Sequence, residues 1–177
     1  MKILLRIVLS VIGLVVFVAL AAFALGATMP EDHVVSITGT VNAPPAKVFA
    51  IITDVADAPS WRPNVKSVEI LPKDNFRDAW IETYNQGPTM KFTALTTAAP
   101  GPNGKGDRNV ETKNDPTFGG SWDYQLSPGP TPGTTTLQIT ESGYIKTPIY
   151  RFMMKYILGP TKNLDQYMSD LQAKVAK

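Results

Sequence analysis

The feature that most constrains this chain is an uncharged apolar run near its start, which extends from Ile7 to Ala27. At about 1.5 Å per residue, a helix of this length spans roughly 30 Å, the thickness of the hydrocarbon core of a bilayer. The run also lacks the polar face that a helix on the surface of a globular domain presents to water. We therefore predict a signal-anchor or transmembrane helix at residues 1–29 and a folded domain at residues 30–177.

Charges at the start of the chain predict how this helix is oriented. Lys2 and Arg6 precede the apolar run, and no acidic residue occurs before Glu31. A basic start favours a single pass through the cytoplasmic membrane, with the N-terminus in the cytoplasm and the domain outside it. The segment Ala22-Phe23-Ala24 resembles the small-residue site of a cleaved signal, so a secreted domain is the alternative.

Composition excludes several classes of function. The formal net charge is +2, and without Lys2 and Arg6 the chain has fifteen basic and fifteen acidic residues. The domain therefore lacks the net positive charge that nucleic-acid binding usually requires. Without cysteine there is no disulfide, thiolate nucleophile or sulfur-ligated metal. We predict no metal and no cofactor, and we interpret His33, the single histidine, as a solvated residue near the membrane. The oligomeric state is left open.

Alternating polar and apolar residues predict a sheet of about seven strands. The first strand is expected at residues 35–41 and is followed by two short helices, the first entered through Pro44 and Pro45. Six further stretches with strand character occupy residues 66–71, 77–85, 89–97, 107–113, 121–126 and 134–145. The short turns between them favour an antiparallel meander.

The periodicity changes in the last part of the chain. From Pro148 to Val175, apolar residues recur at spacings of three and four, which predicts one long amphipathic helix with a kink at Gly159-Pro160. Only this helix is long enough to cover the concave face of a curled sheet, so we predict an α+β fold. Between residues 149 and 158 the apolar residues cover more than one stripe. The apolar residues outside the sheet-facing stripe could contact the bilayer, a partner or a neighbouring loop, and the sequence leaves these three alternatives open.

The stretch FGGSWDYQL predicts an enclosed space between sheet and helix. Trp122 and Tyr124 share one face of a strand, directly after Gly119 and Gly120, and glycines of this kind mark bends in a sheet. We expect the two rings to face the helix. The candidate cavity comprises mainly aromatic residues, which would otherwise form an ordinary core: Trp61, Trp80, Tyr84, Phe92, Phe118, Trp122, Tyr124, Glu141, Phe152, Met153 and Tyr156.

Two carboxylates conflict with the apolar pattern of their strands. Glu141 has the same parity as Leu137 and Ile139, and Glu82 lies between Trp80 and Tyr84. Burial of an unpaired carboxylate is unfavourable, so each needs a cation or hydrogen-bond donors. In a structural interpretation Glu141 pairs with Arg151. In a functional one, Glu141 or Glu82 is a polar anchor or a general acid or base inside the cavity.

Three segments carry a family resemblance: APPAKVFAIITDVADAPSWRPNVKSVEIL (residues 43–71), FGGSWDYQL, and LQITESGYIKTPIYRFMMKYILG (residues 137–159). With them the chain resembles the START-like superfamily (SRPBCC), which includes the polyketide cyclase/dehydrase and lipid-transport proteins. The resemblance implies a helix-grip fold with a deep apolar cavity for lipids, sterols or polyketides. It brings no family-wide catalytic motif and does not include the leader helix.

These observations predict a membrane-anchored, extracytoplasmic domain that binds or carries an apolar small molecule or lipid in an internal cavity. One alternative is an enzyme of the cyclase or dehydratase type that acts on a polyketide or aromatic substrate with Glu141 or Glu82. Another is a non-catalytic module whose cavity is filled by its own side chains and which binds a partner protein.

Overall fold

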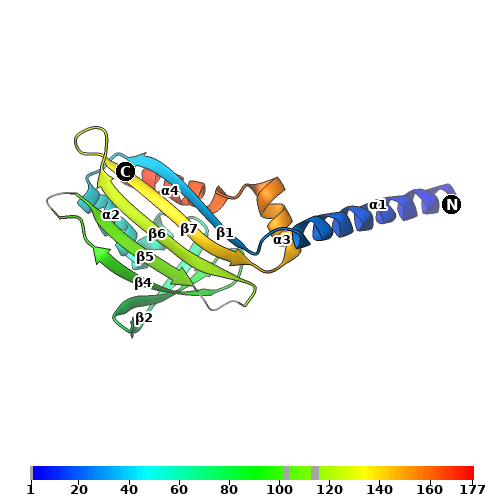
Figure 1. Cartoon of the computed structure of the whole chain (residues 1–177), viewed down its shortest axis with the longest axis horizontal. Coiled ribbons are helices and arrows are strands. Elements are labelled where there is room, and N and C mark those ends of the chain that lie inside the picture. Colours follow the sequence, from blue (N-terminus) through cyan, green and yellow to red (C-terminus); the bar gives the residue numbers. More distant parts are fainter. Residues whose placement is uncertain (1, 102–103, 113–115) are drawn as a thin grey trace.

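A seven-stranded antiparallel sheet is the central element of the folded part in a computed structural model, which describes residues 2–101, 104–112 and 116–177 (Figure 1). Within these residues the strands are β1 (Asp32–Val41), β2 (Val65–Asp74), β3 (Arg77–Tyr84), β4 (Met90–Ala98), β5 (Gly106–Thr112), β6 (Phe118–Pro128) and β7 (Thr135–Ile145). The order across the sheet is β1-β7-β6-β5-β4-β3-β2, so the predicted meander is confirmed. Residue 113, expected at the end of a strand, lies outside the described residues.

The helices differ in whether they pack on the sheet. Those of the described residues are α1 (Lys2–Ala27), α2 (Pro45–Thr53), the 3-10 helix η1 (Val55–Ser60), α3 (Pro148–Met153), the π-helical turn η2 (Met154–Leu158) and α4 (Lys162–Val175). Figure 1 shows α4 across the concave side of the sheet, whereas α1 projects away from it. The predicted helix-grip arrangement, with two short helices after the first strand, is confirmed.

Burial of one stripe of α4 holds it on the sheet. Leu164, Met168 and Leu171 recur at spacings of four and three and are buried against β1, β6 and β7. Leu137 and Ile139 on β7 are fully buried beneath them. Burial of a large aliphatic side chain contributes about 1.5–3 kcal/mol, so a few such residues are sufficient to fix a helix of this length.

The predicted C-terminal helix is present, but at the predicted kink the chain is fully interrupted. Gly159 adopts a φ of 89°, in the left-handed region that favours glycine and ends helices. Pro160 follows and cannot donate the backbone hydrogen bond that would continue the helix. The chain is therefore interrupted between η2 and α4, and only α4 lies in the grip of the sheet.

The segment before this break, α3, packs against the end of α1. The Nε atom of Arg151 donates to the carbonyl oxygen of Gly26 at 2.9 Å, and its Nη1 atom donates to the carbonyls of Ile145 and Lys146 at 3.0 and 2.9 Å. Glu31 lies 3.4 Å from the same Nη1 atom. Arg151 therefore joins α1, α3 and the end of β7. Among the described residues, α1 is the helix that is long and apolar enough to cross a membrane.

We predict that Gly120→Ala destabilises the domain, because a Cβ atom there would lie 2.5 Å from the carbonyl oxygen of Ser142 in the paired strand β7. Such overpacking costs about 1–3 kcal/mol, and each kcal/mol lowers the Tm of a domain of this size by about 2–4 °C. Thermal unfolding of the full chain in detergent measures this. Gly101→Ala is the control, since no described atom lies within 4 Å of the added Cβ. Equal Tm values for both variants would contradict the prediction.

Candidate functional site

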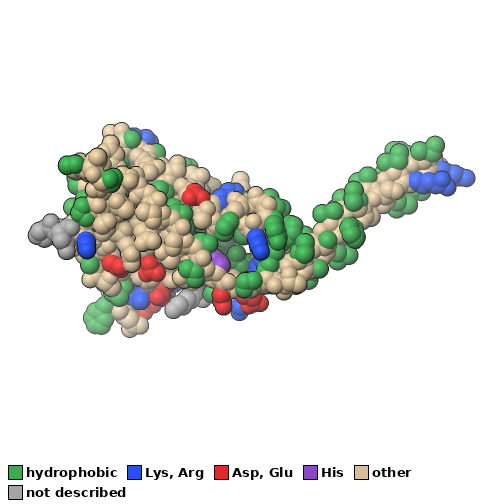
Figure 2. Space-filling view, turned by 45° about the horizontal axis from the view of Figure 1, so that its top comes forward, with side chains coloured by type: hydrophobic (Ala, Val, Ile, Leu, Met, Phe, Trp, Pro, Cys, Tyr) green, Lys and Arg blue, Asp and Glu red, His purple; other side chains and the backbone are tan. Residues whose placement is uncertain are grey.

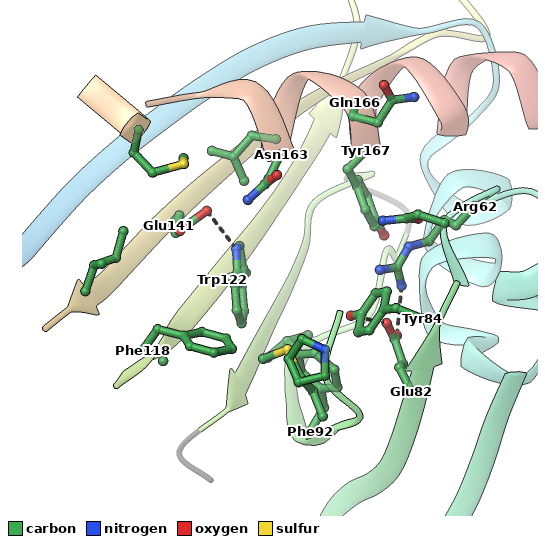
Figure 3. A pocket seen from close by; sticks show the side chains of 18 of the residues that line it. Arg62, Glu82, Tyr84, Phe92, Phe118, Trp122, Glu141, Asn163, Gln166 and Tyr167 are labelled. Carbon is green, nitrogen blue, oxygen red and sulfur yellow. Dashed lines mark hydrogen bonds and ion pairs between the residues drawn. The ribbon is translucent and has the colours of Figure 1, made fainter. Parts of the chain in front are cut away.

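A cavity of about 570 Å³ lies between the sheet and the helices on its concave side. It forms because α4 packs mainly over β1, β6 and β7, whereas β3, β4 and β5 carry a separate core cluster of Trp80, Phe92, Ala94 and Val110. Trp122 and Tyr124 on β6 pack against both core clusters. Figure 3 shows side chains from the strands and from α4 pointing into the space between them.

Most of the predicted cavity residues line this space. They are Trp80, Tyr84, Phe92, Phe118, Trp122, Tyr124, Glu141 and Met153. Trp61 does not line it, because its ring packs edge-on against Tyr167 in the core, with centroids 5.3 Å apart. Phe152 and Tyr156 do not line it either, and their rings contact each other at 5.1 Å. Their placement was predicted from one kinked helix lying along the sheet, whereas the break at Gly159 separates α3 and η2 from α4.

One polar cluster, the Arg62–Glu82 cluster, lies at one side of the cavity. Glu82 is 2% exposed, and its Oε1 atom accepts from Arg62 Nη1 at 2.8 Å and from Trp80 Nε1 at 3.1 Å. Its Oε2 atom accepts from the Tyr84 hydroxyl at 2.6 Å. The carboxylate that conflicted with the strand pattern is thus held by one cation and two further donors.

Burial and charge around this cluster change several pKa values. Burial lowers the pKa of Arg62, but the Glu82 carboxylate outweighs this effect and the net pKa is raised, so the guanidinium stays charged. Burial is the main cause that raises the pKa of Tyr84 and of Tyr124. Burial likewise raises the pKa of Tyr167 to about 12. These hydroxyls therefore remain neutral donors at physiological pH.

A second polar group, the Glu141–His33 pair, lies elsewhere in the cavity wall. Glu141 accepts from Trp122 Nε1 at 3.0 Å, and its other oxygen lies 3.1 Å from His33 Nε2. The predicted pairing of Glu141 with Arg151 was wrong, because Arg151 is directed to the end of α1. The interpretation of His33 as a solvated residue was also wrong, since it is partly buried and lines the cavity.

The two polar groups face an apolar space from different sides. Figure 3 shows Arg62, Glu82 and Tyr84 at one side and Glu141 with Trp122 at the other. The walls between them are mainly aromatic and aliphatic. Such a site suits a largely apolar molecule whose few polar groups are oriented by hydrogen bonds. In the part of the chain that the structure describes, no three His, Asp or Glu side chains are grouped to bind a metal.

The cavity residues that the sequence analysis missed include Arg62, His33 and Tyr167. The position of Glu82 on the apolar face of its strand indicated that it needs a cation or other donors. Arg62 lies in an irregular segment, where no periodic pattern predicts which way its side chain points. Tyr167 was predicted on the apolar stripe of the last helix without being assigned to the cavity. No local signal placed His33 beside Glu141, because this contact depends on the register of β1 against β7, in which Glu141 lies opposite Val35 and His33 lies opposite Gly143.

Comparison with known proteins identifies the family. The family model described as polyketide cyclase / dehydrase and lipid transport matches residues 41–163, more than half of the chain. The chain belongs to this family. A search among curated proteins finds no match.

Solved structures share the fold at low sequence identity. A START superfamily protein from Mycobacterium smegmatis is 23% identical, with a TM-score of 0.61, over 81% of this chain and 97% of that one. The Zhui aromatase/cyclase from Streptomyces sp. R1128 is 16% identical, with a TM-score of 0.63, over 82% and 94%. A truncated norcoclaurine synthase from Thalictrum flavum is 11% identical, with a TM-score of 0.61, over 82% and 94%. These similarities support the fold alone.

We predict that Glu82→Gln destabilises the protein far more than Glu141→Gln. Loss of the Glu82 charge leaves Arg62 as a largely buried cation without its carboxylate, which costs about 3 kcal/mol. An amide at position 141 still accepts from Trp122, and the site is less buried, so that change costs about 1 kcal/mol or less. Denaturant unfolding in detergent measures both values. Equal losses of the free energy of unfolding would contradict the structural role of Glu82.

We also predict that stability falls above pH 10 because of the buried tyrosines. A tyrosine whose pKa is raised by folding contributes stability that is complete below its unfolded pKa of about 10 and is lost as the pH rises through the folded value. For Tyr167 that value is about 12. The free energy of unfolding should therefore fall more steeply between these pH values in the wild type than in Tyr167→Phe. Identical slopes would refute this.

Proposed function

We propose that this protein is a membrane-anchored, extracytoplasmic binding protein that holds an apolar small molecule or lipid in its cavity. The observation that carries the proposal is the unfilled space between α4 and the sheet. Its volume lies within the range of about 300–1,000 Å³ that is usual for ligand pockets. The family, which includes lipid transport in its description, supports the same class of ligand.

The two polar groups restrict the ligand further. A simple hydrocarbon would remove water from the Glu141–His33 pair and from the cavity side of the Arg62–Glu82 cluster without offering them a new hydrogen bond, which is unfavourable for polar groups. A ligand with hydroxyl, carbonyl or carboxyl groups satisfies them. We therefore expect an amphiphile rather than an alkane.

The position at the membrane follows from α1 and the charges before it. Lys2 and Arg6 favour a cytoplasmic N-terminus, so the domain after Pro30 would lie outside the cytoplasm. Intact mass of the protein from its own membranes, combined with protease accessibility of the domain in sealed cells, tests this arrangement. A mass that lacks residues up to about Ala24 would show a cleaved signal and a secreted domain.

An enzymatic function is the second candidate, and the Glu141–His33 pair favours it. A carboxylate beside an imidazole can transfer protons, and both residues line the cavity where a substrate would lie. Glu82 is a poorer candidate, because three donors already occupy it. A cyclase or dehydratase activity that Glu141→Gln abolishes in a folded protein would establish this function in place of simple binding.

We predict that native mass spectrometry of the full chain from its own membranes finds a stoichiometric amphiphile. Trp122→Ala should weaken binding of a fluorescent fatty acid about tenfold or more, since it removes a large aromatic contact in the cavity wall. Phe76→Ala is the matched control, because Phe76 is 92% exposed and lies outside the cavity. Failure of the wild-type protein to bind any apolar probe would overturn the proposed function.

A further inference from the structure

The segment formed by α3 and η2, residues 148–158, exposes apolar side chains where the domain meets α1. Tyr150 and Tyr156 are each 58% exposed, Ile157 is 65% exposed, and Leu158 is also exposed. Figure 2 shows hydrophobic side chains gathered on the part of the domain next to the projecting helix, around a hollow in the surface. This segment does not pack against the sheet as α4 does, so the core does not account for its composition.

The position of this segment relative to the candidate membrane helix is fixed. The carbonyl of Gly26 accepts from Arg151, and Gly26 is packed so closely on Pro148 that an added Cβ would overlap the Pro148 carbonyl. Since α1 ends at Ala27, a bilayer that contains α1 has its outer boundary at this joint. The 148–158 segment then lies at the level of the lipid headgroups.

The composition of the segment suits that level. Tyrosine rings are favoured at membrane interfaces, where they place an apolar body and a polar tip. The ammonium group of Lys155 lies 5.3 Å from the centroid of the Tyr156 ring, and its side chain is exposed, so a cation accompanies the apolar surface. Basic and apolar residues together bind an anionic lipid surface.

The same segment also forms part of the cavity mouth. Tyr150, Met153, Met154 and Leu158 belong both to it and to the cavity wall, and Tyr150 and Leu158 are exposed at the rim. The cavity wall also includes the exposed residues Gln86 and Pro88, from the turn between β3 and β4. One exposed part of the cavity wall therefore lies beside the joint with α1.

We propose that residues 148–158 are a membrane-docking segment that holds the cavity mouth on the bilayer surface, so that the ligand passes directly between the leaflet and the cavity. This inference rests on the proposed function, since it assumes that α1 spans the membrane and that the cavity binds an amphiphile. Beyond the proposed function, it names residues 148–158 as the binding surface and a bilayer with anionic lipid as the partner. It also gives the ligand a direct route between the leaflet and the cavity.

Site-specific labelling tests the docking, because the chain has no native cysteine. An environment-sensitive fluorophore is attached to Ile157→Cys or to the control Phe76→Cys in the full chain, reconstituted in vesicles of phosphatidylethanolamine and phosphatidylglycerol. We expect lipid-borne doxyl groups to quench the label at position 157 and aqueous iodide to quench the label at position 76. Iodide quenching at both positions would overturn the proposal. A label at position 157 that neither agent reaches would also overturn it, because protein would then cover the segment.

The route is tested by the rate of exchange. Ile157→Glu places a charge in the docking segment and should slow transfer of a fluorescent fatty acid from these vesicles about tenfold, with unchanged affinity in detergent. Ile70→Glu is the matched control, since Ile70 is 58% exposed on β2, and it should leave the rate unchanged. Equal rates for both variants would overturn the route. If the wild-type protein binds no probe in detergent, the proposed function fails, whereas the quenching result still decides the docking.

Discussion

The chain cannot continue a helix through Gly159-Pro160, and the rest of the architecture depends on this constraint. After the break, α4 can lie along the sheet and bury its stripe on β1, β6 and β7. Before it, α3 packs at the end of α1, and η2 continues α3. In a continuous helix, the residues that pack on the sheet and the residues that pack on α1 would belong to one rigid element. The break separates the packing that stabilises the domain from the contacts that orient it.

The two carboxylates in the cavity differ in burial and in the number of hydrogen bonds that they already accept. Glu82 is buried and accepts from three donors, so its role in stability accounts for its place on an apolar face. Glu141 is more accessible and pairs with a histidine that itself lines the cavity. A ligand can therefore compete for Glu141 at lower cost than for Glu82. This difference makes Glu141 the better candidate for anchoring or chemistry, whereas the contacts of Glu82 are structural.

The strands and helices were predicted well because the period of apolar residues along each one indicates which side chains face the core. Alternation along β7 placed Glu141 on the same face as Ile139, and the three-and-four spacing identified the buried stripe of α4. Residues in irregular segments have no such period, so Trp61 was expected in the cavity and Arg62 was missed. The partner of Glu141 depended on strand register, which links residues far apart in the sequence. Gly159 followed by Pro160 did carry a signal for a break, which was interpreted as a kink.

The joint at Arg151 also sets the reach of the cavity. A binding protein on a long flexible tether can explore the space beyond the membrane and deliver its cargo at a distance. Here only a few residues separate α1 from β1, and Arg151 fastens them to α3. If α1 remains in the bilayer and the cavity binds a ligand as proposed, the domain is a stationary loading site and not a shuttle. Any onward acceptor must then diffuse in the same membrane or come to the surface to meet it.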